Sequence, residues 1–186
     1  MKIVKIISLS LFLASILSPA TPPGVSLSSE SKFIKTEDGG RLTLETTKYY
    51  ENRATEILLT KTNAEGNEEW YKFYGGRSYD KASDFIKTDD GGYAIIGSTS
   101  SYGKGNYDVY LIKIDAKGNE QWSQTYGAFY NEYGHSLTQK SSGGYTLSGT
   151  RQSCFGDNAA PNCDDEPWFI STDSRGNKVW SGVPQK

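Results

Sequence analysis

The strongest constraint on this chain is a unit that occurs three times at nearly constant spacing. A Gly-Gly pair at residues 39–40 recurs 52 residues later at 91–92, and again after the same interval at 143–144. A Gly-Asn pair followed by tryptophan recurs in the same way at Trp70, Trp122 and Trp180, although the last interval is 58 residues. The six extra residues lie between Thr150 and Glu166. A fixed period of this length is typical of proteins built from repeated supersecondary units.

Every unit contains four short strand candidates separated by turn signals. In the middle copy the predicted strands are 83–88, 93–99, 107–115 and 120–126. The corresponding strands are 32–37, 41–47, 55–63 and 68–74 in the first copy, and 135–141, 145–151, 168–173 and 178–180 in the third. The third strand is apolar almost throughout, as in the run Val109-Tyr110-Leu111-Ile112, which predicts packing on both faces.

Glycine accounts for the predicted turns. Asp-Gly-Gly before the second strand can supply the positive φ angles of a two-residue hairpin loop. Gly66, Gly118 and Gly176 each occupy a left-handed position in a tight connection between the third and fourth strands. A composition with 20 Gly, 13 Tyr and a single Met also suits strands and tight turns better than helices. We therefore predict an all-β chain.

The first twenty residues have the pattern of a signal peptide. Residues 1–5 are basic, residues 6–17 are apolar, and Ser18-Pro19-Ala20 offers the small residues of a cleavage site. An apolar run this short does not comfortably span a hydrocarbon core of about 30 Å. We expect cleavage near Ala20 and a secreted or periplasmic mature chain, in which the Pro- and Ser-rich residues 21–31 form a flexible leader.

The motifs W-x-x-x-Y-G, F-I-K-T-x-D-G-G-Y and D-V-Y-L-I-K-x-D-x-x-G-N-x-x-W together resemble the β-propeller repeats of secreted bacterial and archaeal proteins. The resemblance covers residues 33 to about 182 and implies three four-stranded antiparallel blades, at 32–82, 83–134 and 135–182. Its last part is also similar to the tryptophan-docking motif of quinoprotein dehydrogenase propellers, in which the tryptophan packs between adjacent blades. That structural role is implied for Trp70, Trp122 and Trp180.

Three blades are too few for a ring, because propellers usually close with four to eight. The chain is therefore a piece of a longer ancestor, half of a six-bladed homodimeric ring, or an open wedge of three sheets. Exposed apolar blade faces would favour the homodimer.

Cys154 and Cys163 are the only two cysteines and lie within the insertion at 152–165. In an exported protein we expect them to form a disulfide that closes this loop. A redox pair or a metal site is less expected, because no other Cys or paired His supports it. The insertion also carries oxygen-bearing side chains, namely Asp157, Asn158, Asn162, Asp164, Asp165 and Glu166. They could hold Ca²⁺, but their spacing matches no known calcium loop, so we expect no metal and no cofactor.

The connections between second and third strands supply the candidate ligand-binding residues, which are Tyr49, Tyr50, Tyr102, Tyr107 and Phe155. Exposed aromatic side chains on the loops of a rigid scaffold are suited to binding glycan or protein, although capping of blade edges explains them equally well.

The function predicted from these features is that of an exported scaffold or recognition module for protein or glycan, without catalysis. The alternative is an extracytoplasmic, glycosidase-like hydrolase with paired carboxylates at the blade mouth. The lone His135 has no nucleophile motif beside it, so triad chemistry is not expected. No cluster of Lys and Arg could follow a phosphate backbone, so nucleic acid is not an expected partner.

Overall fold

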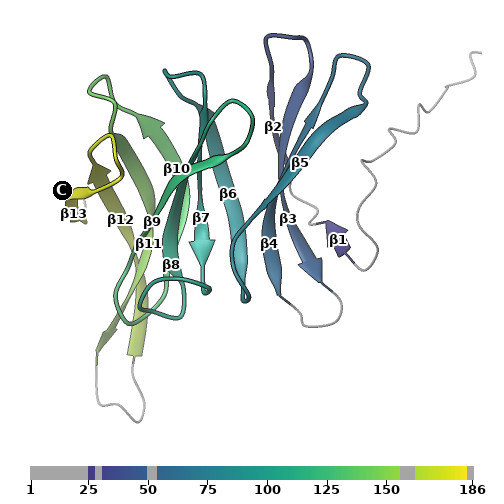
Figure 1. Ribbon diagram of the computed structural model, residues 1–186. Helices are drawn as coiled ribbons and strands as arrows, with labels where there is room; N and C mark the ends of the chain where they lie inside the picture. Colours follow the sequence, from purple (N-terminus) through teal and green to yellow (C-terminus); the bar gives the residue numbers. More distant parts are fainter. Residues whose placement is uncertain (1–24, 28–30, 50–53, 156–161, 184–186) are drawn as a thin grey trace, which may run out of the picture.

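The computed structural model describes residues 25–27, 31–49, 54–155 and 162–183. Within these ranges the chain has no helix, and its strands form three antiparallel sheets of five, four and four strands, none of them closed. The sheets stand side by side in chain order, as Figure 1 shows. This is the architecture of an incomplete propeller, so the predicted fold class is confirmed.

Blade 1 consists of β1 (Val25–Leu27), β2 (Lys32–Lys35), β3 (Arg41–Tyr49), β4 (Thr55–Thr62) and β5 (Glu68–Tyr74). Blade 2 consists of β6 (Asp80–Lys87), β7 (Tyr93–Thr99), β8 (Asp108–Ile114) and β9 (Glu120–Tyr126). Blade 3 consists of β10 (Glu132–Gln139), β11 (Tyr145–Phe155), β12 (Asn162–Thr172) and β13 (Lys178–Gly182).

The four repeated strands of each blade pair with their sequence neighbours, so every blade is a meander from a first strand to a fourth. β1 is an addition to this pattern. It pairs with β3 at Thr47–Tyr49, beyond the stretch of β3 that β2 uses. Residues 25–27, expected to lie within a flexible leader, thus extend the sheet of blade 1.

Two apolar layers hold the blades together. The layer between blades 1 and 2 includes Leu42, Leu44, Ile57 and Leu59 on one side and Phe85, Tyr93, Ile95 and Ile112 on the other. The layer between blades 2 and 3 includes Ala94, Ile96, Val109 and Leu111 opposite Leu137, Tyr145, Leu147 and Ile170. Strands β7 and β8 are buried at every residue, because blade 2 has a neighbour on each side. This confirms that the apolar third strand of the middle copy packs on both faces.

The outward face of blade 3 is polar at positions that are apolar in blade 2. Ala94 and Ile96 of β7 belong to the layer that contacts blade 3. The residues 52 positions later are Thr146 and Ser148, which lie on the opposite side of β11 from the buried Leu147. Pro167 and Phe169, at the positions of Val109 and Leu111, keep apolar groups on blade 3 and are not fully buried. Terminal repeats of stacked arrays need a polar outer face for solubility, and blade 3 meets this requirement only at Thr146 and Ser148.

The turn between the first two strands of a blade differs from the two-residue loop that we expected. The N–H of Gly91 donates to Thr88 O, and the N–H of Thr88 donates to Gly92 O, so a four-residue turn closes at Gly92. Gly91 has a φ of 81°, whereas Gly92 is not in the left-handed region. A side chain at Gly92 would instead overlap the carbonyl oxygen of Ile114. The two glycines are thus required for different reasons, the first for its φ angle and the second for close approach of two backbones.

A buried lysine fastens this turn to the rest of blade 2. The side chain of Lys113 is 5% exposed, and its Nζ lies 2.8 Å from Asp90 Oδ2 and 3.0 Å from the carbonyl oxygen of Ile114. Lys61 makes the same contacts in blade 1, to Asp38 and Thr62. In blade 3 the equivalent strand position is Ser171, and Lys140, from the turn itself, reaches the carbonyl oxygen of Thr172 at 2.6 Å. All three blades therefore keep an ammonium group on the same carbonyl, although it comes from a different position in blade 3.

The ion pair of Asp90 predicts an acid-sensitive stability. Burial favours the neutral carboxyl, but hydrogen bonds from Lys113, Thr88 and Gly92 outweigh it and lower the pKa of Asp90 from 3.8 to about 2. Because the folded pKa lies below the unfolded one, this stabilisation is present above about pH 4 and is lost as the pH falls through about 2. Since the Asp90 side chain is 54% exposed, we expect it to contribute only about 1 kcal/mol.

Urea unfolding at pH 7 and at pH 2 tests this. Asp90→Asn should be less stable than wild type at pH 7, and the difference should disappear at pH 2. The neighbouring Asp89→Asn serves as the control and should change little at either pH. An Asp90→Asn variant with wild-type stability at pH 7 would contradict the role of the pair.

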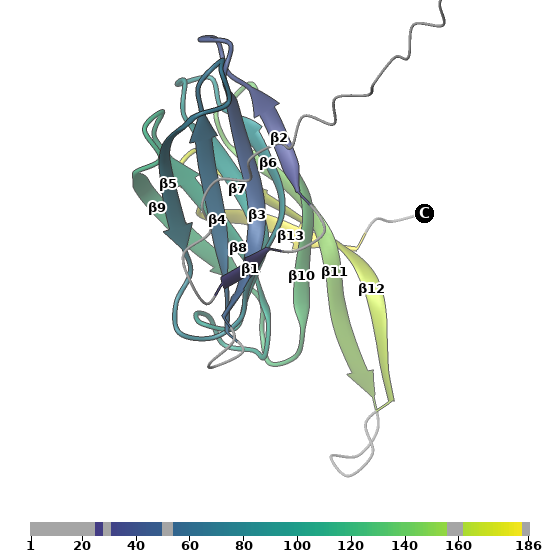
Figure 2. The ribbon, with the colours of Figure 1, turned by 90° about the vertical axis from the view of Figure 1, so that its right-hand side faces the viewer.

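The insertion at 152–165, expected to be a loop, is largely strand. β11 and β12 are each 11 residues long and pair from Thr146–Ser171 out to Phe155–Asn162. Cys154 and Cys163 face each other in this ladder and form a disulfide with an S–S distance of 2.09 Å, which confirms the predicted pairing. Figure 2 shows the resulting ribbon projecting well beyond the ends of the other strands. The disulfide joins the two arms of this ribbon near its tip.

The predicted signal peptide at 1–20 lies outside the described residues. Within the part of the chain that the structure describes, no helix is long and apolar enough to cross a membrane.

Candidate functional site

The first strands of blades 2 and 3 contain β-bulges at equivalent positions. Pairing of β6 with β7 shifts between Ala82 and Asp84, so Ser83 is the extra residue, and pairing of β10 with β11 shifts at His135. Bulges of this kind redirect side chains and are frequent beside functional sites. Ser83 and His135 accordingly lie together on the wall of one hollow.

Glycines on the neighbouring strands make room for the bulges. A Cβ on Gly97 would overlap the carbonyl oxygen of Lys81, and a Cβ on Gly149 would overlap that of Tyr133. The equivalent residue of blade 1 is Glu45, and the described pairing of β2 with β3 ends one residue before it, at Leu44. The glycines are therefore the local sequence feature that permits the bulges in blades 2 and 3.

Three tyrosines line a hollow at the junctions of the blades. Tyr79 precedes β6, Tyr107 precedes β8, and Tyr133 belongs to β10. The rings of Tyr107 and Tyr133 lie 5.5 Å apart with an angle of 36° between their planes. The cavity has a volume of about 290 Å³, and its remaining lining residues are Thr46, Thr55, Lys81 and Ser98. We call it the tyrosine pocket.

Parallel backbone bridges between blades hold these tyrosines in place. Thr55 pairs with Tyr79 where blade 1 meets blade 2, and Tyr107 pairs with Asn131 where blade 2 meets blade 3. Loss of hydration on burial raises the pKa of both Tyr107 and Tyr133, and each ring is also close to another tyrosine. Both phenols therefore stay neutral across the physiological pH range and keep a hydrogen to donate.

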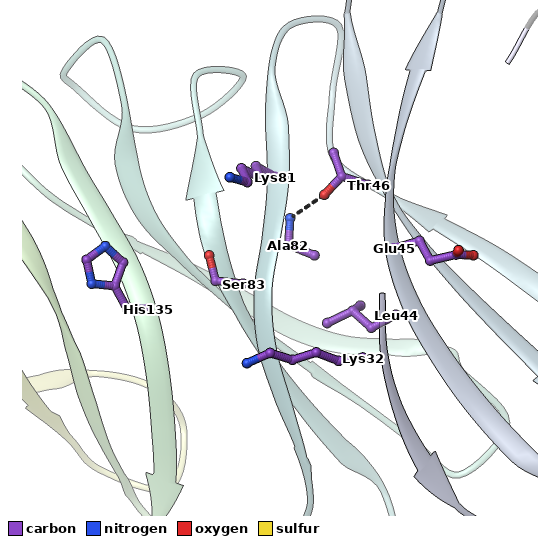
Figure 3. A pocket seen from close by; sticks show the side chains of 8 residues that line it. All are labelled: Lys32, Leu44, Glu45, Thr46, Lys81, Ala82, Ser83 and His135. Atoms are coloured by element: carbon purple, nitrogen blue, oxygen red, sulfur yellow. Dashed lines mark hydrogen bonds between the residues drawn. The ribbon is translucent and has the colours of Figure 1, made fainter. Parts of the chain in front are cut away.

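A second hollow adjoins the tyrosine pocket and shares Thr46 and Lys81 with it. Its volume is about 270 Å³, and its other lining residues are Lys32, Leu44, Glu45, Ala82, Ser83 and His135. Figure 3 shows the ammonium groups of Lys32 and Lys81 pointing toward the strand that carries His135, whereas the carboxylate of Glu45 points the other way. The dashed line in Figure 3 is the hydrogen bond that the N–H of Ala82 donates to Thr46 Oγ1 at 3.1 Å, which ties blade 1 to the bulge. We call the two hollows together the groove.

Buried carboxylates lie between the blades but outside the groove lining. Asp108 is 1% exposed and accepts hydrogen bonds at 3.0 Å from the backbone N–H groups of Lys104 and Gly105. Glu132 is 4% exposed and accepts one at 3.2 Å from the N–H of Ala128. Both carboxylates crowd the position that a side chain on Gly127 would occupy. Burial, followed by the charge of Asp108, raises the pKa of Glu132, partly offset by the Ala128 N–H and by Arg151.

Asp80 occupies the same position in blade 2 as Glu132 in blade 3. It is completely buried and accepts hydrogen bonds from the hydroxyls of Thr99 and Ser101 and from the N–H of Gly76. Carboxylates that bind their own backbone in this way fix the loops that enter each blade.

The structure places the predicted ligand-binding aromatics in different surroundings. Tyr107 lines the groove. Tyr102 instead packs against Tyr110 at 5.6 Å and donates its hydroxyl hydrogen to Gly75 O at 2.8 Å, so it seals the edge between blades 1 and 2. Tyr50 lies outside the described residues, and only the backbone of Tyr49 and Phe155 is described, as the last residues of β3 and β11.

Tyr79, Lys81 and Tyr133 were not among the residues predicted to bind a ligand. A signal was present, since Lys81 and Tyr133 stand at equivalent positions of two units, as do Thr55 and Tyr107. Residues that maintain the repeated framework are similar in every unit, so a position whose side chain changes from unit to unit is a candidate for ligand binding. The spacing of these residues in the sequence does not show that they line the same pocket.

The three tryptophans assigned a structural role also differ in their surroundings. The indole of Trp70 lies 2.8 Å from the place a Cβ on Gly118 would take, and that of Trp122 lies 2.6 Å from the same point on Gly176. Each contact runs from one blade to a turn of the next. Trp180, in the last blade, is 53% exposed.

The acidic residues of the insertion do not converge where they are described. Asp164 and Asp165 are exposed on β12, and Glu166 forms an ion pair with Arg151 at 2.7 Å. Asp157 and Asn158 lie outside the described residues. Among those that are described, no group of three or more His, Cys, Asp or Glu side chains is placed to hold a metal ion.

No protein-family model matches the chain, and no characterised protein has significant similarity to its sequence.

Proposed function

We propose that this protein is a recognition module that binds glycan in the groove between its blades. The observation that carries the proposal is the tyrosine pocket, in which three aromatic rings and three hydroxyl-bearing side chains line one hollow. The apolar faces of sugar rings stack on aromatic side chains, while sugar hydroxyls need nearby donors and acceptors. The phenol hydroxyls of Tyr107 and Tyr133 supply such groups. The hydroxyls of Thr46, Thr55 and Ser98 already make hydrogen bonds with the backbone of Ala82, Asp80 and Gly134.

The position of the groove supports the same proposal. Its walls come from β2, β3, β6, β7 and β10, from the first residue of β4 and from the residues just before β6 and β8, so all three blades contribute. Binding sites are commonly built from loops and strand ends held by a rigid scaffold. The bulges at Ser83 and His135 and the bridges at Tyr79 and Tyr107 fix this wall before a ligand arrives.

A glycan array followed by calorimetry with the best-bound sugar tests the proposal. We expect Tyr107→Ala and Tyr133→Ala each to weaken binding about tenfold, which corresponds to about 1.4 kcal/mol. Tyr71→Ala is the control, because Tyr71 is an exposed tyrosine on β5 in contact with Phe73 rather than with the groove. The proposal is wrong if no glycan binds, or if the Tyr71 variant loses as much affinity as the two groove variants.

The glycosidase-like alternative needs two carboxylates that reach a bound sugar. Among the described residues of the groove, the one carboxylate is Glu45, which points away from the cations. Asp108 and Glu132 are adjacent, but their burial and backbone hydrogen bonds favour a structural role. Release of new reducing ends from a bound glycan would nevertheless support the hydrolase.

Membership of the propeller repeat type of secreted proteins belongs to the same proposal. Two inter-blade contacts support it, since Tyr74 donates to Gly118 O at 2.7 Å and Tyr126 donates to Gly176 O at 2.6 Å, next to the tryptophan contacts. Export is supported by the Cys154–Cys163 disulfide, because such bonds persist in oxidising compartments.

The homodimeric ring stays a prediction. Trp180 is exposed, and nothing lies within 4 Å of the place that a Cβ on Gly66 would take. In a homodimer, Trp180 of one copy could therefore pack against the turn at Gly66 of the other. Thr146 and Ser148, on the outward side of β11 in blade 3, favour an open wedge instead. Light scattering on a sizing column separates the two, since a mass of two chains would support the ring.

A further inference from the structure

We infer that the groove selects acidic glycans, and that Lys81 receives the carboxylate or sulfate of the bound sugar. This rests on the proposed glycan-binding function and adds the chemical class of the ligand. Lys81 lines both hollows, and so stands between the three tyrosines and the bulge residues. An anionic substituent on a ring stacked at the tyrosines is therefore beside an ammonium group.

The positive charge of Lys81 has no carboxylate partner among the described residues. Its side chain is exposed, and within the described ranges its ammonium makes no ion pair or side-chain hydrogen bond. The buried lysines, Lys61 and Lys113, by contrast, each have a carboxylate partner below 3 Å. A lysine placed in a pocket without a partner is available to a ligand, whereas Lys61 and Lys113, which bind the turns, are not.

The carboxylates near Lys81 are engaged elsewhere or turned away. Asp80, the preceding residue, is completely buried and holds two hydroxyls and a backbone N–H. Asp84 is bound to Lys32 at 2.9 Å. Glu45 belongs to the opposite face of β3, and its carboxylate points away from the cations in Figure 3. Across the hollow lies His135, which carries no carboxylate. Among the described lining residues, Lys81 is thus a cation without a carboxylate partner, in a chain whose net charge is −2.

The position of Lys81 beside the three tyrosines argues against a cationic ligand. Tyrosine-lined pockets can bind quaternary ammonium groups through the faces of their rings. Here an unpaired ammonium already lines the pocket, and like charges brought together without a counterion oppose binding. Lys81 therefore favours an anion over a cation in contact with the same rings.

The repeat alignment shows that the charge is specific to one blade. The residue equivalent to Lys81 in blade 3 is Tyr133, so two equivalent positions place an ammonium and a phenol in one hollow. A repeated structural lysine, such as Lys61 and Lys113, would be expected in more than one unit. The single occurrence fits a role in ligand recognition.

The test compares two probes that differ only in charge, a tetrasaccharide of galacturonic acid and the same tetrasaccharide after reduction of its carboxyl groups to alcohols. Calorimetry at low ionic strength should show at least tenfold tighter binding of the acidic probe to the wild-type protein. Lys81→Gln should remove this preference by weakening binding of the acidic probe about tenfold, with the neutral probe changed by less than twofold. Lys72→Gln, an exposed lysine on β5, is the matched control and should keep the preference.

The outcomes separate this inference from the proposed function. Equal affinity of the wild-type protein for the two probes, or a preference that survives in Lys81→Gln, overturns the acidic selectivity while leaving glycan binding in place. Weaker binding of both probes to Tyr107→Ala supports the groove as their common site. If neither probe binds and the glycan array also shows no binding, the proposed function fails together with the inference.

Discussion

Replacing Trp122 by alanine should lower the free energy of unfolding by about 3–5 kcal/mol, as is usual for removal of a large aromatic side chain from a packed position. Trp122 packs against the apolar layer between blades 2 and 3, its ring centre lies 6.0 Å from that of Tyr145, and its edge reaches the turn at Gly176. The variant loses these contacts at once and leaves a cavity where the two blades meet. Denaturant unfolding, followed by far-UV circular dichroism, measures the difference.

The chain supplies its own control for this prediction. Trp180 occupies the equivalent position in blade 3 but is 53% exposed, because within the described residues no further blade packs against it. Trp180→Ala should therefore cost less than about 1 kcal/mol, as is usual for surface substitutions. Similar losses for the two variants would show that Trp122 does not stabilise the junction of the blades. A large loss for Trp180→Ala alone would indicate that its surface is covered in solution, as the homodimer requires.

Replacing Gly97 by alanine should destabilise the protein by about 1–3 kcal/mol and also disturb the groove. The added methyl group would overlap the carbonyl oxygen of Lys81, and overpacking against backbone costs this much when the chain has to shift. The shift would fall on the bulge at Ser83, which sets the direction of Lys81 and the surrounding wall. We expect the variant to stay folded at 25 °C, so unfolding will not account for a loss of glycan affinity. A lower affinity would therefore report the altered shape of the groove.

Glu45 is the matched position in blade 1, where a side chain is already present and the described pairing with β2 ends one residue earlier, at Leu44. Glu45→Ala should leave stability within about 0.5 kcal/mol of wild type, in the range of ordinary surface substitutions. Amide exchange of the β6–β7 ladder reports the bulge directly. An unchanged exchange pattern and unchanged stability in Gly97→Ala would show that the bulge does not depend on the glycine.

The sequence was informative wherever structure depends on neighbouring residues. The glycines that allow tight turns and the apolar run from Val109 to Ile112 are local features that recur in all three units. The alternation that places Leu42 and Leu44 on one face recurs in the second unit only. Because the same local signals appear three times, the chain determines its three blades and their strand order without reference to distant contacts. The disulfide was predictable for a similar reason, since two cysteines in one short insertion have few other partners.

Local patterns were misleading where strands lengthen by pairing with each other. The residues from Gln152 to Asp165 look like a polar loop, yet most of them continue β11 and β12, because a cross-strand partner and the disulfide stabilise the ladder beyond the body of the blade. Val25–Leu27 likewise becomes a strand only because the edge of β3 at Thr47–Tyr49 is free to pair. Propensity is too weak to decide either case.

The groove was decided by the tertiary structure alone. Tyr79, Lys81, Tyr107 and Tyr133 come from two blades and are brought together by the stacking of sheets, by two bridges between blades and by bulges that glycines on neighbouring strands permit. Tyr102 is as good a candidate by sequence as Tyr107, but packing turns it against Tyr110 and away from the groove. The sequence by itself determined the repeated framework, because turns and strand patterns act over a few residues. Which side chains share a cavity depends on how whole sheets pack, and only the folded chain settles that.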